Sequence, residues 1–186
     1  MNRIAIPTVE HTPAATLPLL AAVQKQLGVV PNLMKLVGNS PAALEGYLSL
    51  NGALAKGSIG VKTTERIALA ISEINACGYC LSAHTYLGKN LAKLDDAEIE
   101  ANRSGKSSDA KADAAVHFAT RVATARGHVS DDEVKAVKAA GFSDAEVVEI
   151  VLHVALTTLT NYVNEVALTE IDFPQVRAST HLNSQA

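Results

Sequence analysis

The sequence predicts an all-α fold in a single domain. Ala, Leu and Val dominate a chain in which 48% of the residues are hydrophobic, and this mixture favours helix over sheet. No segment alternates apolar and polar residues for more than a few positions, as a half-buried strand would. Apolar runs at helical spacing instead follow residues that can cap a helix. We therefore expect an arm over residues 1–13, one helical domain over 14–174 and a polar tail over 175–186.

Glycine and proline mark the helices of the first part of the domain. Gly28 ends the first helix and Gly38 ends a short second one. Ser40 followed by Pro41 is a strong helix start, with Ser as the N-cap and Pro at the first helical position. The helices expected here cover residues 14–27, 33–37 and 41–56.

The central helices are separated by a break that contains both cysteines of the chain. Thr63 or Thr64 should cap a helix whose apolar residues recur at helical spacing. Residues 75–78 interrupt it, and a further helix follows over residues 79–90. We expect the break to reverse the chain, so that the two helices pack as an antiparallel pair.

Caps also mark the helices of the last part of the domain. Ser130 with Glu133, and Ser143 with Glu146, fit the capping-box pattern. The last helix, over 144–169, is apolar on more than one side, which fits either a central core helix or a homo-oligomer. The other helices expected here cover residues 94–105 and 109–126 and a segment that starts at 130.

Composition excludes several function classes. A formal charge of −3 argues against nucleic-acid and anionic-membrane partners, and the absence of Trp removes the usual stacking platforms for single-stranded nucleic acid. Two cysteines cannot form a disulfide scaffold for 186 residues. The N-terminal residues lack the apolar stretch of a signal peptide, and no window reaches the length of a membrane span. We expect a cytoplasmic protein.

The two cysteines form a C-x-x-C motif, Cys77-Gly78-Tyr79-Cys80, at the start of a helix. The amides and dipole of a helix N-terminus favour a thiolate there. In a cytosolic chain, a lone C-x-x-C is more often a redox motif than a structural one. We therefore expect Cys77 and Cys80 to form a redox-active pair.

Two further residues complete a proton relay. His84 lies one helical turn after Cys80 on the same face, where it can take the thiol proton or stabilise the thiolate. The chain reversal places Glu65 at the level of His84 or slightly beyond it. The expected order is Cys80, His84, Glu65, with room for a water molecule between the last two.

The residues alone leave three other interpretations open. Cys77, Cys80 and His84 could be three zinc ligands, although no second motif supplies a fourth. They could belong to a thioredoxin-type motif, although no strand precedes Cys77. The cysteines could also be buried structural thiols beside an unrelated histidine.

The segment from Glu65 to His84 resembles the signature of the AhpD-like proteins of the carboxymuconolactone decarboxylase superfamily, in particular the branch of peroxidase-related proteins. Their pattern is Glu, eleven residues, C-x-x-C, three residues and His, and this chain matches all four positions. The resemblance extends over about residues 28–174 through Val30-Pro31-Asn32-Leu33, Ser40-Pro41-Ala42-Ala43-Leu44 and Asn161-Tyr162-Val163-Asn164-Glu165.

The resemblance implies an AhpD-like helical domain and a thiol-dependent peroxidase that assembles into trimers or hexamers. Cys80 would attack the peroxide, Cys77 would close the disulfide, and Glu65 and His84 would form the relay. The partners would be a peroxide substrate and a reductant protein, either lipoyl-bearing or thioredoxin-like. Neither a cofactor nor a bound metal is expected. The alternatives are a protein-disulfide oxidoreductase or thiol adaptor, and a non-enzymatic helical oligomer with a metal-binding or structural Cys-Cys-His cluster.

One departure from the family pattern concerns the relay. AhpD itself carries a second His just before the second Cys, where this chain has Tyr79. A phenol with a pKa near 10 cannot act as a base near pH 7, so the relay here should be shorter. Decarboxylases of the superfamily generally lack the cysteine pair, which argues against their chemistry.

The remaining polar candidates are weaker. Glu73 could approach the site, although a capping or solvent role fits it better. Asn161 and Asn164 fall within an apolar helix and could either line a pocket or join two helices. Two histidines, at 117 and 153, lie on apolar helical faces and fit hydrogen-bonded core residues, and two others, at 11 and 181, lie in the terminal segments.

Overall fold

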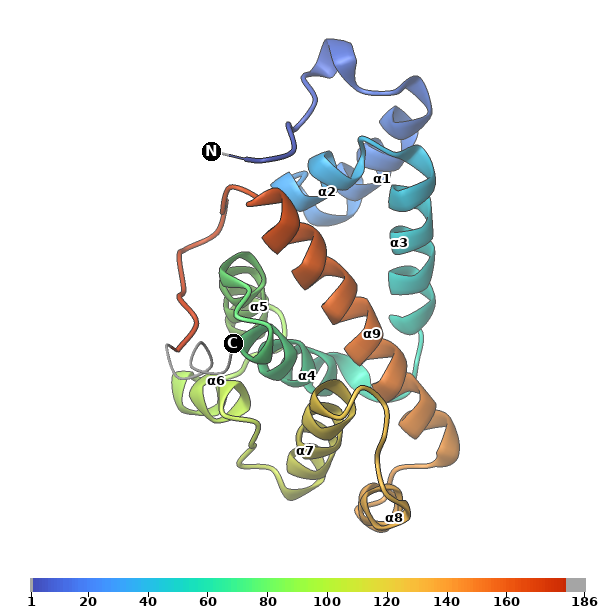
Figure 1. Cartoon of the computed structure of the whole chain (residues 1–186), viewed down its shortest axis with the longest axis vertical. Coiled ribbons are helices and arrows are strands. Elements are labelled where there is room, and N and C mark those ends of the chain that lie inside the picture. Colours follow the sequence, from blue (N-terminus) through green and yellow to red (C-terminus); the bar gives the residue numbers. More distant parts are fainter. Residues whose placement is uncertain (1, 180–186) are drawn as a thin grey trace.

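The computed structural model describes residues 2–179, and this part of the chain is helical without a strand. The all-α prediction is confirmed. Figure 1 shows the helices. In chain order they are η1 (Val9–His11) and η2 (Ala14–Thr16), which are 3-10 helices, and then α1 (Leu17–Leu27), α2 (Asn32–Val37), α3 (Pro41–Leu54), α4 (Gly60–Ile74), α5 (Gly78–Asn90), α6 (Asp96–Arg103), α7 (Ala110–Thr124), α8 (Asp131–Ala139) and α9 (Asp144–Ala167).

Helix α4 is the centre of the fold. It packs against α5, α6, α7 and α9, and its Ile67, Leu69 and Ile71 are fully buried. Helix α9 crosses the molecule diagonally, with α3 alongside it and α8 near its first turn (Figure 1). The core therefore lies around the helix pair α4–α5 and the long helix α9. Helices α1, α2 and α3 pack together, and α2 and α3 also contact α9.

Most helix starts follow the local capping signals. Ser40 accepts a hydrogen bond from the amide of Ala43, and Asp95 and Asp109 cap α6 and α7 in the same way. Both expected capping boxes are present, at the starts of α8 and α9. Gly28 ends α1 with a φ of 75°, a left-handed conformation that glycine adopts without strain.

The start of α4 differs from the prediction. The helix begins at Gly60, so Thr63 and Thr64 lie inside its first turns and do not cap it. The carboxylate of Glu149 in α9 accepts hydrogen bonds from the amides of Ser58 at 2.8 Å and Ile59 at 3.2 Å. A side chain about ninety positions away thus satisfies amides next to this helix start, and no local hydroxyl is needed.

The end of α9 also differs slightly. The helix stops at Ala167, before the expected residue 169, because Leu168 turns into a left-handed conformation with a φ of 50°. The amides of Leu168 and Thr169 both donate to the carbonyl of Asn164 and close the last turn.

Helix α9 contradicts the expectation that no segment reaches the length and hydropathy of a membrane span. Among residues 2–179 it is the one helix that is long and apolar enough, with a mean hydropathy of 1.2 over its best window. Length and composition alone are weak evidence for a span. The helix packs against α3, α4 and α7, and only one of its faces stays exposed.

Both ends of the described chain lie against the helical body. The amide of Arg3 donates to the carbonyl of Ala167 at 2.7 Å, and Asn39 donates to the carbonyl of Ala5. After α9 the chain runs back past α5 (Figure 1). We call residues 170–179 the C-terminal strap; the rest of the expected tail, residues 180–186, lies outside the described residues.

Candidate active site

The two cysteines lie where the chain turns from α4 into α5. Ala76 adopts a left-handed conformation with a φ of 52°, and Cys77 then becomes the N-cap of α5. The sulfur of Cys77 accepts a hydrogen bond from the amide of Cys80 at 3.4 Å. Both thiols are reduced and buried. The C-x-x-C motif is thus held by the first turn of a helix.

Cys80 is the acidic member of the pair. A hydrogen bond from the Cys77 thiol favours its thiolate, burial opposes it, and the charge of His84 and a hydrogen bond from Asn164 favour it further, so that the pKa of Cys80 falls to about 6. The amide nitrogen Nδ2 of Asn164 lies 3.2 Å from the sulfur. The same hydrogen bond to Cys80, together with burial, raises the pKa of Cys77. Near pH 7 the pair is one thiolate beside one thiol.

His84 and Glu65 form the next pair. The Nδ1 atom of His84 lies 2.9 Å from Oε2 of Glu65, a direct contact with no water between them. Burial lowers the pKa of His84, but the Glu65 carboxylate and the Cys80 thiolate more than offset this, and the pKa lies above its ordinary value. The structure brings Glu65, His84, Cys80 and Cys77 together in the expected order.

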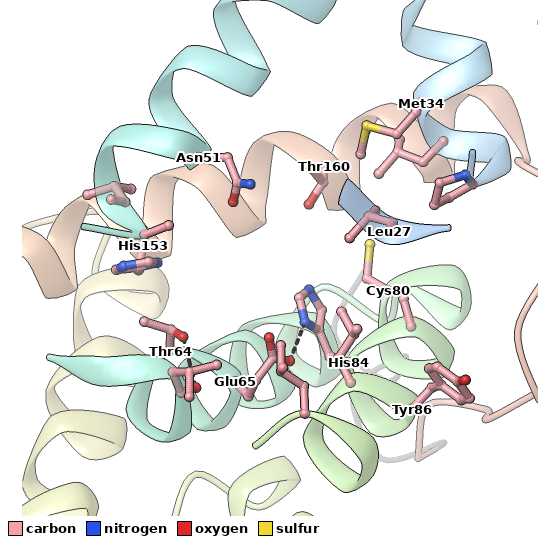
Figure 2. A pocket seen from close by; sticks show the side chains of 18 of the residues that line it. Leu27, Met34, Asn51, Thr64, Glu65, Cys80, His84, Tyr86, His153 and Thr160 are labelled. Carbon is pink, nitrogen blue, oxygen red and sulfur yellow. Dashed lines mark hydrogen bonds and ion pairs between the residues drawn. The ribbon is translucent and has the colours of Figure 1, made fainter. Parts of the chain in front are cut away.

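A pocket of about 530 Å³ opens onto this cluster between α4 and α5 on one side and α3 and α9 on the other (Figure 2). Cys80, His84 and Glu65 line it, whereas Cys77 does not. The wall is mainly apolar, with Leu27 and Met34 among the residues near Cys80. A molecule in this pocket can therefore reach only one of the two sulfurs.

Tyr79 does not face the relay as a base. Its hydroxyl donates to Oδ1 of Asp172 at 2.8 Å and accepts from the amide of Leu33 at 3.1 Å. Burial raises its pKa, so the phenol stays protonated at neutral pH. Tyr79 thereby ties α5 to α2 and to the C-terminal strap, whose Ile171 and Phe173 pack on the same apolar cluster as Cys77.

The strap is fixed at further points by side chains of α5 and α4. The amide of Val176 donates to Ser82, and the amide of Ser179 donates to Glu73. Glu73 also accepts from Arg103 at 2.8 Å. Glu73 thus holds the strap and not the active site, and it does so as a buried, ion-paired residue, so the expected capping or solvent role was wrong.

The structure decides between the two roles expected for Asn161 and Asn164, and it adds Tyr47, which the sequence did not indicate. Asn164 lies against Cys80, whereas Asn161 joins helices by bonding Ser72 and Asn75. Tyr47 lines the pocket, and burial together with the charges of Cys80 and Glu65 raises its pKa to about 12. These contacts join helices that are distant in the sequence. The one local signal for them is the presence of two asparagines within an otherwise apolar helix.

His117 and His153 were both expected to be hydrogen-bonded core residues, and neither is fully buried. His153 is half-buried and lines the pocket. His117 is exposed, so its assignment to the core was wrong. His11 bonds Thr8 in the arm, and His181 lies outside the described residues. Within residues 2–179, no three His, Cys, Asp or Glu side chains are arranged to hold a metal ion.

Comparison with known proteins agrees with this architecture. The sequence model of the carboxymuconolactone decarboxylase family matches residues 41–125, a range that contains Glu65, both cysteines and His84. Among proteins of curated function, none matches the chain.

Several solved structures share the fold. A peroxidase-related protein from Ralstonia eutropha JMP134, described as an alkylhydroperoxidase AhpD core, is 22% identical, with a TM-score of 0.81 and 92% of each chain covered. A peroxidase-related protein from Silicibacter sp. TM1040 is 21% identical, with a TM-score of 0.77, covering 98% of this chain and 93% of its own. The debrominase Bmp8, solved with 2,3,4-tribromopyrrole, is 18% identical, with a TM-score of 0.75 and 91% of each chain covered.

At these identities the structural likeness establishes the fold, and the family match covers the central helices with the C-x-x-C segment. Residues 41–125 match the carboxymuconolactone decarboxylase family, and the chain has the fold of the AhpD-like, peroxidase-related structures.

Proposed function

We propose that the protein is a thiol-dependent peroxidase that reduces an organic hydroperoxide with Cys80 and Cys77. One observation carries the proposal. The thiol with the lowered pKa, Cys80, is also the one that lines the pocket, whereas Cys77 is a fully buried thiol behind it. A nucleophile needs both the thiolate form and access to its substrate, and Cys80 alone has both.

The reaction has three steps. The Cys80 thiolate attacks the terminal peroxide oxygen, the O–O bond breaks, and the leaving alkoxide takes a proton to become an alcohol, which leaves Cys80 as a sulfenic acid. The Cys77 thiol then displaces hydroxide from that sulfur, and a proton converts it to water as the disulfide forms. An external dithiol reduces the disulfide and restores both thiols.

Glu65 and His84 are suited to supply the protons. His84 lies one turn from Cys80, and its bond to Glu65 favours the protonated imidazolium. The imidazolium stabilises the thiolate before the attack and donates a proton to the leaving alkoxide afterwards. Glu65 fixes the ring and balances its charge. Because the Tyr79 hydroxyl is bonded to Asp172 and Leu33, the proposed relay consists of His84 and Glu65 alone.

The reductant we propose is a protein dithiol, either lipoyl-bearing or thioredoxin-like. Such partners keep thiols reduced in the cytoplasm, which is where we place this protein. A thiol adaptor that passes electrons between proteins would use the same residues. It differs in that its disulfide would form by exchange with a protein disulfide, and not by reaction with a peroxide.

A stopped-flow assay tests the peroxidase proposal. The reduced protein is mixed with cumene hydroperoxide and the loss of free thiols is followed, with Cys80→Ser and Cys77→Ser as variants. We expect the wild type to lose two thiols per hydroperoxide, Cys77→Ser to lose one, and Cys80→Ser to lose none. Equal losses in the two variants would contradict the assignment, and no reaction in the wild type would favour the adaptor.

The debrominase structure supports a second candidate, reductive dehalogenation. Bmp8 shares the fold, and its structure contains a halogenated pyrrole. In the corresponding reaction, two thiols would supply two electrons and a proton, so that a carbon–bromine bond becomes carbon–hydrogen with loss of bromide. Parallel assays for bromide release from tribromopyrrole and for cumene hydroperoxide consumption would separate the two activities.

We also propose that two copies of the chain associate through α9. Leu152, Leu159 and Val166 recur every seven residues on its exposed face, the spacing with which paired helices interlock. The exposed apolar residues of this helix are Val148, Val151, Leu152, Leu159, Tyr162 and Val166. This face supports the homo-oligomer, for which the family resemblance implies a trimer or a hexamer.

Sedimentation equilibrium tests the α9 interface. We expect Leu159→Asp to reduce the mass toward that of one chain, 19.5 kDa, and Val9→Asp, at a more exposed apolar site in the arm, to leave it unchanged. A wild type that sediments as a monomer would contradict the proposal. Binding of that monomer to vesicles would then assign the apolar face to a membrane surface.

A further inference from the structure

Helix α3 forms part of the pocket wall opposite the relay pair. Tyr47, Asn51 and Leu54 of α3 line the pocket at helical spacing, so one face of this helix is turned toward it. In Figure 2, Asn51, one turn after Tyr47, extends into the pocket from the side opposite Glu65 and His84. Tyr47 also packs on the apolar cluster that contains both cysteines. Its ring therefore lies near the reacting sulfur, on a different helix from the relay.

The hydroxyl of Tyr47 has no hydrogen-bond partner among residues 2–179. The protein does not enclose this oxygen completely, so a molecule in the pocket can reach it. Other hydroxyls of the pocket are already bonded, that of Tyr79 to Asp172 and that of Thr160 to a backbone carbonyl of its own helix. Pockets orient their ligands with a few such polar groups. Tyr47 thus offers a free hydrogen-bond donor close to the reacting sulfur.

The surroundings of Tyr47 keep its proton in place. Burial, the charge of the Cys80 thiolate and the charge of the Glu65 carboxylate together raise its pKa to about 12. The phenol therefore donates a hydrogen bond near pH 7 and does not become a competing nucleophile or base. A phenol is still a stronger acid than an aliphatic alcohol, so its hydrogen bond to an alkoxide is of the strong, charge-assisted kind. An oxygen that gains negative charge in the pocket is the partner that this hydroxyl fits best.

We propose that Tyr47 is a further catalytic residue, whose hydroxyl donates a hydrogen bond to the carbon-bound oxygen of the hydroperoxide. The proposal rests on the proposed peroxidase function. When Cys80 attacks the terminal oxygen, a sulfur lone pair forms the S–O bond, the O–O bond breaks, and its electron pair remains on the carbon-bound oxygen. The negative charge thus moves from the sulfur to that oxygen, where the Tyr47 hydroxyl stabilises it. The imidazolium of His84 supplies the proton that completes the alcohol, and Tyr47 keeps its own.

Parallel kinetics with two electrophiles test this role. Reduced wild type and Tyr47→Phe are mixed with cumene hydroperoxide or with iodoacetamide, whose leaving iodide is a weak base and gains little from a hydrogen-bond donor. We expect the rate constant with the hydroperoxide to fall about tenfold to a hundredfold in Tyr47→Phe, at or below the usual loss for one such donor. Alkylation of Cys80 should change little. Tyr162→Phe, which removes an exposed hydroxyl of α9 outside the pocket, should change neither rate constant.

Two results would overturn the proposal. One is an unchanged rate constant with the hydroperoxide in Tyr47→Phe, which would mean that the hydroxyl does not contact the reacting oxygens. The other is an equal loss with both electrophiles, which would mean that Tyr47 acts on the sulfur and not on the leaving oxygen. Circular dichroism and urea midpoints establish that the variant is folded. If it does not fold, the labelled phenol carbon of Tyr47 in the wild type replaces it, and cumyl alcohol, but not cumene, should move its signal; a signal that stays in place would contradict the contact.

A binding experiment separates this role from the peroxidase function. Cumyl alcohol carries the oxygen that a bound hydroperoxide would present to Tyr47, and cumene lacks it. The affinity for each compound is measured by the protection of Cys80 against iodoacetamide. We expect the preference for the alcohol to fall about fivefold in Tyr47→Phe, the usual contribution of one neutral hydrogen bond. An equal preference in both proteins would contradict the hydrogen bond. If the wild type consumes no hydroperoxide but this preference still falls, the peroxidase function fails and the hydrogen-bond site stands.

Discussion

The side-chain amide of Asn164 donates a hydrogen bond to the sulfur of Cys80 at 3.2 Å, across 84 positions of sequence. This contact joins α9 to the first turn of α5. It places a fixed dipole against the sulfur, and it adds to the hydrogen bond from Cys77 and the charge of His84 in favouring the thiolate of Cys80, the thiol that lines the pocket. The cysteine motif supplies the reactive atoms, and α9 supplies part of the environment that activates one of them.

Replacing Asn164 tests this activation. In a Cys77→Ser background, which leaves one thiol, Asn164→Leu should raise the pKa of Cys80 by about one to two units, because hydrogen bonds to charged groups are the strong ones. The pH dependence of alkylation by iodoacetamide measures the pKa. Thr160→Val is the matched control, since Thr160 lies on the same face of α9 and bonds only backbone carbonyls. A pKa that moves equally in both variants would argue against a specific contact.

Replacing Glu65 tests the imidazolium. The carboxylate raises the pKa of His84, and Glu65→Gln removes that effect, so the ring loses its proton at a lower pH. Turnover of cumene hydroperoxide should fall about tenfold at pH 7.5 and less at pH 5.5, since a nearby opposite charge shifts a pKa by roughly one to three units. Nitrogen chemical shifts of His84 give its pKa directly. Glu45→Gln, at an exposed site of α3, should change neither quantity.

Glu98 is a buried carboxylate that stabilises the fold away from the site. It accepts hydrogen bonds from Arg66 at 2.7 Å and from the amide of Ser108 at 2.9 Å. Burial raises its pKa, but bonds from Ser107 and Ser108 outweigh this and lower it to about 2. Glu98→Gln should destabilise the protein by about 3 kcal/mol at pH 7, as expected for a broken buried ion pair.

The pH dependence of this effect has a definite sign. Because the pKa of Glu98 is lower in the folded protein, its stabilising contribution is complete above the ordinary carboxyl pKa of 4.5 and is lost as the pH falls toward 2. The difference between wild-type and Glu98→Gln urea midpoints should therefore shrink from pH 6 to pH 3. Glu100→Gln, which removes an exposed partner of Arg103, should change stability by less than about 0.5 kcal/mol.

The hydroxyl of Tyr79 should be structural. Tyr79→Phe removes the bonds to Asp172 and Leu33 and should cost about 1–2 kcal/mol in unfolding free energy. It should also loosen the C-terminal strap, so that Cys77 is alkylated faster in a Cys80→Ser background. Tyr86→Phe is the control, since that side chain also contacts Phe173 and is more exposed. An unchanged alkylation rate of Cys77 would mean that the strap does not limit access to it.

Local chemistry explains which parts of the fold could be predicted. The caps at Ser40, Asp95, Asp109, Ser130 and Ser143 act within four residues, so the sequence indicates them directly. The start of α4 could not be found in this way, because its neighbouring amides are bonded by Glu149 from another helix. His117 was expected in the core and is exposed. An apolar stretch of helix predicts that one face is buried, but tertiary packing decides which face that is.

The residues of the candidate site also fall into those that the sequence could indicate and those that it could not. The spacing of Glu65, Cys77, Cys80 and His84 spans one helix pair, and a chain reversal was enough to bring them together. Asn164 and His153 reach the pocket from α9, whose position depends on packing against α4. Their contribution needed the tertiary structure.

The central claim is that Cys80 attacks the hydroperoxide, and trapping of its sulfenic acid tests it most directly. The Cys77→Ser variant lacks the thiol that would consume the sulfenic acid, so treatment with one equivalent of cumene hydroperoxide and dimedone should label Cys80, as peptide mass spectrometry would detect. The Cys80→Ser variant, treated in the same way, should remain unlabelled at Cys77. A dimedone adduct on Cys77, or none on Cys80, would contradict the account.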